Sequence, residues 1–378
     1  MTMTDIAIDS QKLLRTFLEL VRLDSPSGAE GPVREYLIER VKALGLSHQV
    51  DSYGNVVVTV PGNTQSDTTL AITGHMDVVP PCLGVQPVLV GDDSDDILIC
   101  SDKTTVLGAD DKAGLAPMLE ALELSLKDNL PRPNLLFLWT VREELAIAGA
   151  RDMDPALYGH ADFVIGFDHT GKMETLIYEA PTYINVTITV HGKSVHAGIM
   201  PEKGINAIKL LSEVLAKCQF GQLDDNTTSN IGFIKGGKAT NIVPDLAVAQ
   251  CELRGHNDTR LEQELVFYQQ MLAETIDPVE GASYEFTHDV SFRHYKTVLA
   301  HDGVQKTCKA METLGLKAHP IRTNGGSDVN VFTEHGVPGI VLSAGYMEPH
   351  SLNERVYLKD MVICTRLLLA IWEQFAHG

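Results

Sequence analysis

The chain has 378 residues, and its 50 Asp and Glu outnumber its 30 Lys and Arg, so the formal net charge is −20. This acidic balance argues against nucleic acid or an anionic membrane surface as a partner. At about 150 residues per domain, the length predicts two or three domains, each large enough to bury a hydrophobic core.

Helical and strand-like patterns alternate over the first 180 residues. Apolar residues recur at helical spacing in three segments, residues 9–23, 31–46 and 113–126. Short apolar or β-branched runs next to turn residues predict strands at residues 55–60, 70–72, 135–141 and 163–167. Strands that alternate with helices predict an α/β domain, with a mixed sheet and helices on both faces.

The pattern changes near residue 180. Strands are predicted at residues 183–190, 230–234, 246–253 and 283–290, with helices at 204–217 and 259–275. This β-α-β-β-α-β order predicts a ferredoxin-like α+β sandwich. The first pattern then resumes, with helices at 304–314 and 358–375 and a strand at 340–343. We therefore predict an α/β domain of residues 1–180 and 295–378, interrupted by an inserted domain of residues 181–294.

Two kinds of segment are missing from the sequence. No apolar run approaches the roughly 18 residues of a membrane span, and the first residues, MTMTDIAIDSQK, lack the layout of a secretory signal. The six cysteines form no CxxC pair, which argues against a thiolate zinc site and a disulfide framework. We therefore expect free thiols and a cytoplasmic protein.

Polar residues gather where the predicted strands of the α/β domain end. They are His75 and Asp77, then Glu143 and Glu144, then Asp168 and His169, and finally Glu348 and His350. A further pair, Asp110 and Asp111, precedes the helix at 113–126. Because ligands bind at the carboxyl ends of strands in open α/β sheets, we expect these groups to converge at one edge.

Each of these groups also has an ordinary structural explanation. A lone histidine after a strand is more often a core or surface residue than a ligand, and adjacent acids are common at helix N-termini. Five such groups at one sheet edge are hard to explain in that way, because clustered carboxylates repel one another without a cation. Imidazoles and carboxylates without a thiolate suit a hydrolytic zinc, manganese or cobalt centre.

The segments TGHMDVV, LGADDKAG, VREEL and MEPHS, with Asp168 at a strand end, resemble the M20 metallopeptidases. Three further segments, HGKSVHAG, PEKGINAI and KATNIVPD, are similar to the peptidase T branch of that family. The resemblance extends over nearly the whole chain. One departure is Ala146, at a position where the family commonly has glycine.

The resemblance implies two divalent metal ions, most simply zinc, with manganese or cobalt as alternatives. The implied ligands are Asp110 as the bridge, His75 and Asp168 for one ion, and Glu144 and His350 for the other. The implied catalytic groups are Glu143, as the general base that activates water, and Asp77, which would orient His75. The family also implies a cis peptide between Asp110 and Asp111.

The resemblance further implies substrate contacts, namely His196, Asn241, Arg254 and the glycine-rich loop at Gly325. His196 would reach the active site of a partner subunit, so a homodimer through the inserted domain is expected. An arginine suits a peptide carboxylate because its two N–H groups can bind both oxygens. His256, close to Arg254 in the sequence, has no assigned role.

The implied function is aminopeptidase hydrolysis of short peptides such as tripeptides. The same metal core cleaves many amide bonds, so an N-acyl amino acid amidohydrolase or a carboxypeptidase is the main alternative. A non-catalytic, metal-stabilised binding protein is a more distant one.

Overall fold

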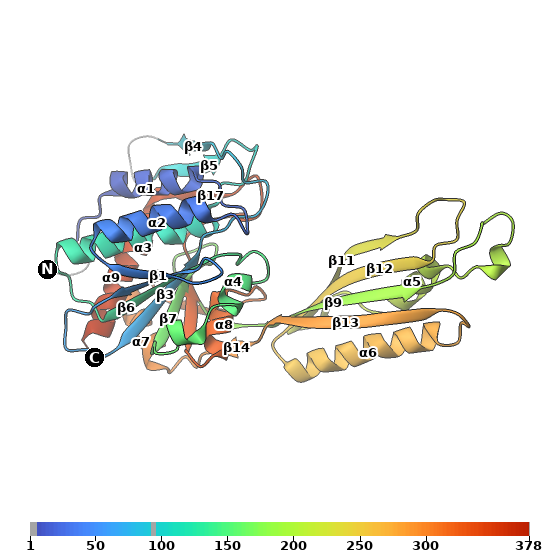
Figure 1. Ribbon diagram of the computed structural model, residues 1–378. Helices are drawn as coiled ribbons and strands as arrows, with labels where there is room; N and C mark the ends of the chain where they lie inside the picture. The colour runs from blue at the N-terminus through green and yellow to red at the C-terminus, as the bar shows by residue number, and fades with distance from the viewer. Residues whose placement is uncertain (1–5, 92–95, 378) are drawn as a thin grey trace. The chain divides into compact units, whose positions relative to one another are not determined.

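The computed structural model describes residues 6–91 and 96–377, and the chain divides into two units (Figure 1). The first, here called the sheet unit, comprises residues 1–179, 295–323 and 327–378. The second, here called the inserted unit, comprises residues 180–294 and 324–326. The predicted boundaries differ from these at residue 180 and at residues 324–326.

The segment 324–326 belongs to the inserted unit because it packs there, although the prediction assigned it to the α/β domain. The Arg254 guanidinium donates a hydrogen bond of 3.2 Å to the Asn324 carbonyl. Gly326 lies so close to the Phe292 ring that a Cβ there would be 2.1 Å from its nearest atom. Only glycine allows this approach of backbone to ring.

The sheet unit is built on a nine-stranded mixed sheet. In spatial order its strands are β1 (Ser47–Val50), β2 (Val56–Val60), β6 (Asn134–Thr140), β3 (Thr69–His75), β7 (Phe163–Phe167), β16 (Gly339–Leu342), β8 (Thr175–Ala180) and β14 (Tyr295–Lys296), and β15 (His319–Arg322) pairs with β8. The four neighbours β6, β3, β7 and β16 are parallel. Their carboxyl ends therefore lie at one edge of the sheet.

Helices cover both faces of this sheet. They are α1 (Ser10–Arg22), α2 (Gly31–Ala43), α3 (Ala109–Lys127), α4 (Ala148–Arg151), α7 (Asp302–Thr313), α8 (Asp328–Glu334) and α9 (Leu358–Ala376). Neighbouring residues of β3 show the two faces, since Gly74 packs against α3 and Thr73 contacts Asp328 of α8. Helix α3 packs against both α1 and α9. A small antiparallel sheet of β17 (Arg355–Tyr357), β5 (Leu98–Ser101) and β4 (Pro87–Val90) completes the unit.

The inserted unit is the predicted α+β sandwich. Its elements are β9 (Thr182–His191), α5 (Ala207–Leu215), β10 (Gly221–Asp224), β11 (Thr227–Gly236), β12 (Leu246–Gly255), α6 (Asp258–Ile276) and β13 (Ser283–Phe292). The sheet is antiparallel, with the order β10-β11-β12-β9-β13. Residues of β9 alternate strictly between buried and partly exposed, because one face packs on α5 and α6 while the other does not. The short strand β10 is not in the predicted order.

Within the described residues, no helix combines the length and the apolar character needed to cross a bilayer. All six cysteines are free.

A fully buried asparagine joins two loops of the sheet unit. Asn55 Nδ2 donates to the Gly149 carbonyl at 2.9 Å, and its Oδ1 accepts the Val141 amide at 3.0 Å. Gly149 is held so tightly that a Cβ would lie 1.8 Å from the Val141 carbonyl oxygen. Asn55 therefore supports the turn that follows β6.

Replacing Asn55 by alanine should lower the free energy of unfolding of the sheet unit by about 2 kcal/mol, because two buried backbone groups lose their partners. Urea unfolding followed by tryptophan fluorescence measures this change, since both tryptophans lie in the sheet-unit core. Gln49→Ala, an exposed position on β1, is the control and should change little. An Asn55→Ala midpoint equal to that of the control would contradict the assignment.

Candidate metal centre

The parallel strands bring most of the predicted ligands to one edge of the sheet. His75 is the last residue of β3, and Asp168 directly follows β7. Glu143 and Glu144 follow β6 in a turn, and His350 lies in the loop after β16. Ligand atoms of His75, Asp110 and Glu144 all lie within 4.8 Å of one another. The predicted convergence of distant segments is thus present in the structure.

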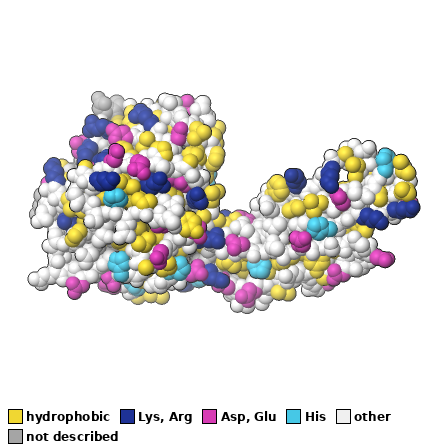
Figure 2. All heavy atoms as spheres, in the orientation of Figure 1, with side chains coloured by type: hydrophobic (Ala, Val, Ile, Leu, Met, Phe, Trp, Pro, Cys, Tyr) yellow, Lys and Arg dark blue, Asp and Glu magenta, His cyan; other side chains and the backbone are white. Residues whose placement is uncertain are grey.

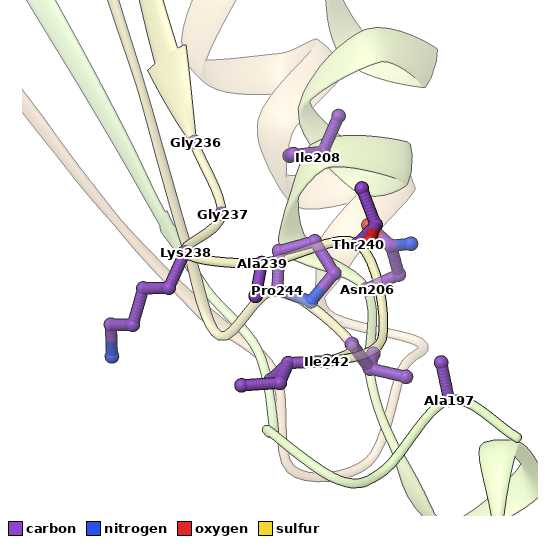
Figure 3. Close-up of a pocket in the computed structure, with 11 residues that line it drawn as sticks. Ala197, Asn206, Ile208, Gly236, Gly237, Lys238, Ala239, Thr240, Ile242 and Pro244 are labelled. Atoms are coloured by element: carbon purple, nitrogen blue, oxygen red, sulfur yellow. The ribbon is translucent and has the colours of Figure 1, made fainter.

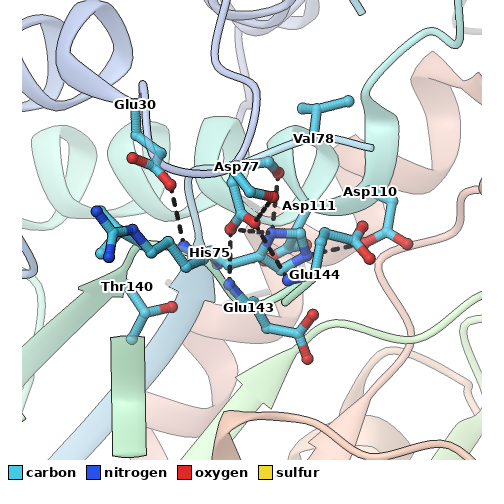
Figure 4. Close-up of polar contacts among 12 residues, drawn as sticks. Glu30, His75, Asp77, Val78, Asp110, Asp111, Thr140, Glu143 and Glu144 are labelled. Carbon is cyan, nitrogen blue, oxygen red and sulfur yellow. Dashed lines mark hydrogen bonds and ion pairs between the residues drawn. The ribbon is translucent and has the colours of Figure 1, made fainter. Parts of the chain in front are cut away.

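Asp110 lies between two imidazoles. Its Oδ1 is 2.9 Å from His75 Nε2, and its Oδ2 is 3.3 Å from His350 Nε2 (Figure 4 shows the His75 side). Each imidazole has a second carboxylate neighbour: Asp168 Oδ1 is 3.6 Å from His75 Nε2, and Glu144 Oε1 is 2.9 Å from His350 Nε2. The side chains thus form two groups that share Asp110. The Asp110–Asp111 peptide is cis.

Asp77 links His75 to the turn that carries the two glutamates (Figure 4). Its Oδ1 accepts the Glu143 amide at 2.9 Å and lies 3.4 Å from His75 Nδ1, which also contacts the Asp77 carbonyl at 3.0 Å. Its Oδ2 accepts the Glu144 amide at 3.1 Å. The Ser27 hydroxyl donates to the same oxygen at 2.7 Å. One buried carboxylate therefore fixes both the imidazole and the turn.

The turn itself has an unusual backbone. Arg142, Ala146 and Ile147 adopt φ values of 53°, 58° and 61°, a left-handed conformation that favours glycine. Ala146 therefore occupies a backbone conformation that glycine would adopt with less strain. Glu30 Oε1 accepts the Arg142 amide at 3.1 Å and the Gly28 amide at 2.7 Å, which holds the start of the turn (Figure 4).

Carboxylates outnumber positively charged groups at this site. Burial raises the pKa of Asp168 to about 7, and burial raises the pKa of Glu143 and of Asp111 well above the usual range. Asp110 differs: burial alone would raise its pKa, but hydrogen bonds from His350 and His75 hold the pKa below its usual range. The two imidazoles cannot balance the converging carboxylates, so the donor set fits divalent cations.

Tyr346 and Asp328 near the site were not predicted, and Asp111 was expected at this edge without an assigned role. Asp111 is buried between Gly74 and Gly114, where a Cβ would come within 2.6 and 2.5 Å of its oxygens. The Tyr346 hydroxyl donates to Asp168 Oδ1 at 3.2 Å. Asp328 accepts the Thr140 hydroxyl at 2.6 Å. No sequence pattern indicated the Tyr346 and Asp328 contacts, because they join segments that are distant in the chain.

The four predicted substrate contacts form two groups within the inserted unit. His196 and Asn241 lie in paired loops, where His196 bridges to Ile242 and the Ala197 amide donates to the Asn241 carbonyl at 2.9 Å. Arg254 lies near the other end of β12, with its guanidinium 4.4 Å from the centre of the Tyr183 ring. There it contacts Asn324, the neighbour of Gly325. His256 also contacts Asn324, at 3.3 Å.

A pocket of about 530 Å³ lies beside the first of these groups (Figure 3). Its lining comprises Ala197, Asn206, Ile208, Gly236, Gly237, Lys238, Ala239, Thr240, Ile242, Val243 and Pro244. In Figure 3 most of these residues come from the start of α5 and from the end of β11 with the loop that follows it, and Ala197 comes from the loop after β9. The pocket therefore belongs to the inserted unit and contains none of the predicted metal ligands.

Comparisons with known proteins agree with this description. Residues 178–279 match the model of the M20 peptidase dimerisation domain, and residues 55–191 match that of peptidase family M28. A tripeptidase from Staphylococcus aureus is 34% identical, with 98% of this chain and 100% of that chain covered and a TM-score of 0.91. Aminopeptidase PepT from Bacillus cereus is 32% identical, with 98% and 99% covered and a TM-score of 0.86.

A peptidase T from Alkaliphilus oremlandii is 26% identical over 97% of this chain and 100% of its own length. Together with the site geometry, these similarities define a metal-dependent peptidase. The chain belongs to the M20 family of metallopeptidases, and within it to the peptidase T type.

Replacing Asp77 by asparagine should lower kcat and the affinity for divalent metal by about 10- to 100-fold, because an amide cannot accept both the Glu143 and Glu144 amides. Peptide hydrolysis and metal titration measure the two effects. The exposed Asp67→Asn is the matched control and should behave like the wild type. Wild-type kcat in the Asp77 variant would show that Asp77 does not position these groups.

Proposed function

We propose that this chain is a tripeptide aminopeptidase that works with two divalent metal ions. The observation that carries the proposal is the arrangement around Asp110, whose two oxygens face different imidazoles. Each imidazole has its own additional carboxylate, Asp168 or Glu144. A shared carboxylate between two His-carboxylate groups is the arrangement expected for a two-ion centre.

In this proposal His75 and Asp168 hold one ion, Glu144 and His350 hold the other, and Asp110 bridges them. Bound there, the ions would polarise the scissile carbonyl and lower the pKa of an attacking water. Zinc suits nitrogen and oxygen ligands at a hydrolytic site, and manganese and cobalt accept the same donors.

Glu143 is the proposed general base. Burial raises the pKa of Glu143, which suits a carboxylate that accepts a proton from water and then releases it to the leaving amine. Its neighbour Glu144 is engaged with His350, whereas no contact of the Glu143 carboxylate with either histidine is seen within the described residues. The Asp77 contact to the Glu143 amide would keep the base at a fixed distance from the ions.

Arg254 and the Gly325 loop would bind the peptide's carboxyl-terminal part. The Arg254 side chain is held between the Tyr183 ring and the Asn324 carbonyl, so its guanidinium loses little freedom on binding a carboxylate. Glu252 also pairs with Arg254, at 3.2 Å. A peptide carboxylate would compete with Glu252 for this cation.

The distance between the two groups of substrate contacts supports a homodimer. Strand β12 has ten residues and spans about 30 Å, and His196 and Asn241 lie beyond the end opposite Arg254. A tripeptide extends at most about 10 Å, so one substrate cannot reach both groups of the same inserted unit. In this proposal, His196 and Asn241 therefore serve the active site of a partner copy.

The surface of the inserted unit offers an edge for that partner. The outer edge of β11 pairs with β10 only through residues 227–229, and Phe233 and Ile234 further along are 46% and 56% exposed. Unpaired edges of this kind commonly pair with another chain. Figure 2 shows further exposed hydrophobic side chains on the inserted unit, and Ile199 and Met200 are themselves 69% and 41% exposed. We also propose a cytoplasmic location, which suits the free cysteines.

Metal removal and blocked peptides test the reaction type. Protein treated with a chelator should lose tripeptide hydrolysis and recover it with zinc, manganese or cobalt, because the proposed reaction needs the ions to activate the water. Tripeptides with a free amino terminus should be cleaved, and their N-acetylated forms should not.

Three other outcomes have different meanings. Preference for acetylated substrates would favour the N-acyl amino acid amidohydrolase, and release of the carboxyl-terminal residue would favour the carboxypeptidase. Bound metal without turnover of any peptide or acyl amino acid would favour a binding protein.

Subunit complementation tests the partner assignment. Glu143→Gln should bind both ions but lose the base, and His196→Ala should lose an oxyanion donor, so each homodimer should be at least about 100-fold slower. A heterodimer of the two variants, purified with two affinity tags, has one complete site and should show about half of the wild-type rate.

A heterodimer of Glu143→Gln with the double variant Glu143→Gln, His196→Ala is the control and should stay inactive. A mixed heterodimer as slow as the parent variants, or a fully active monomer in light scattering, would contradict the proposal.

A further inference from the structure

Glu354 is a buried acid that none of the assigned roles includes. It is 1% exposed and follows the His350 loop, directly before β17. Its Oε2 accepts the Gly108 amide at 2.7 Å, and its Oε1 accepts the Asp110 amide at 2.9 Å. One carboxylate thus holds the backbone at Asp110, whose side chain faces both imidazoles, and at Gly108.

The loop that carries His350 is anchored at both ends. Met347 and Arg355 exchange backbone hydrogen bonds of 2.8 and 3.1 Å, which closes the loop at its base. Arg355 then pairs with Cys100 in the small sheet. The Glu354 amide donates to the Ser351 carbonyl at 3.1 Å, so the loop folds back just before Glu354. Glu354 is therefore a fixed point close to His350.

The other partner of Glu354 is the start of α3. Gly108 has a φ of 75° and, being glycine, has no side chain that could cap the helix. Asp110 and Asp111 have non-helical backbone angles, so the Gly108 and Asp110 amides lie in a kinked segment before the regular part of α3. A buried amide without a partner is costly, and the Glu354 carboxylate supplies the acceptors for these two amides. This explains why an acid is tolerated so close to Asp110.

We propose that Glu354 is a positioning residue for the metal ion that Glu144 and His350 would hold, here called the second ion, because Glu354 connects the Asp110 loop to the His350 loop. The proposal rests on the proposed two-ion function. These two loops bring Asp110 Oδ2 to within 3.3 Å of His350 Nε2. Glu354 contacts the Asp110 loop and is itself part of the His350 loop. The ion proposed for His75 and Asp168 shares only Asp110 with these two loops, because its other two ligands are attached to β3 and β7.

The substitution Glu354→Gln tests this role. Glutamine has a single acceptor oxygen, and its amide N–H₂ would face the other backbone N–H, so one of the two loops should lose its support. We expect the ion held by Glu144 and His350 to bind about 10- to 100-fold more weakly, and the ion held by His75 and Asp168, which shares only Asp110 with these loops, to be weakened less. Metal titration by calorimetry, and the magnetic coupling of a manganese pair in electron paramagnetic resonance, measure this change without relying on activity.

The control is Glu348→Gln, the same substitution in the same loop, at a half-exposed side chain that pairs with Arg355 rather than with the Asp110 loop. It should bind two coupled ions. Two ions of wild-type affinity in Glu354→Gln would overturn the role of Glu354. If the wild-type protein itself binds fewer than two ions, the two-ion function fails instead.

A measurement on the unaltered chain covers the case in which Glu354→Gln does not fold. The contacts of Glu354 involve only protein atoms, so they should protect the Gly108 and Asp110 amides even in metal-free protein. Hydrogen exchange resolved to these two amides should be slow in the metal-free wild type. Exchange as fast as that of an exposed loop would overturn the proposal.

Discussion

Mutual repulsion among buried carboxylates is the interaction on which the architecture of the sheet unit depends. Four parallel strands end at one edge, and each contributes an acid or an imidazole there, so negative charge accumulates where water is scarce. Burial, together with the charge of neighbouring carboxylates, raises the pKa of Asp168 and of Glu143. The fold can maintain the cluster only if donors and cations compensate for it.

Backbone amides provide much of this compensation. Asp77, Glu354 and Glu30 are all almost fully buried, and each accepts two backbone N–H groups of a loop at the site. These acids do not face the imidazoles in the way that Asp110 does. Their oxygens accept backbone N–H groups and so hold the loops in place. Carboxylates at this site therefore have two uses, as ligands of a cation and as supports of the backbone.

The contrast between predicted and missed residues follows from how each is positioned. His75, Asp168 and Glu144 could be predicted because a strand end gives a local pattern, and parallel strands then fix the destination. The same pattern included His350 and Asp110, and the family resemblance added the role of each residue in a two-ion site. Glu354 could not be predicted, since its partners are amides nearly 250 positions away and amides leave no trace in the side-chain sequence. Strand β1, short and largely exposed, lacks the apolar run that marked the central strands, and β4, which is apolar, has only four residues and is largely exposed.

The segment 324–326 was misplaced for a similar reason. Its glycines indicated a loop, but the surface on which that loop packs is set by the ring of Phe292 and the guanidinium of Arg254, which lie in another unit of the sequence.

The place of this segment also bears on the proposed function. The Gly325 loop and Arg254 form one end of the inserted unit, while His196 and Asn241 form the other. If the two ends serve different active sites, a defect in the core of β12 would impair both sites of a dimer, whereas a change at one end of β12 in a single subunit would impair only one.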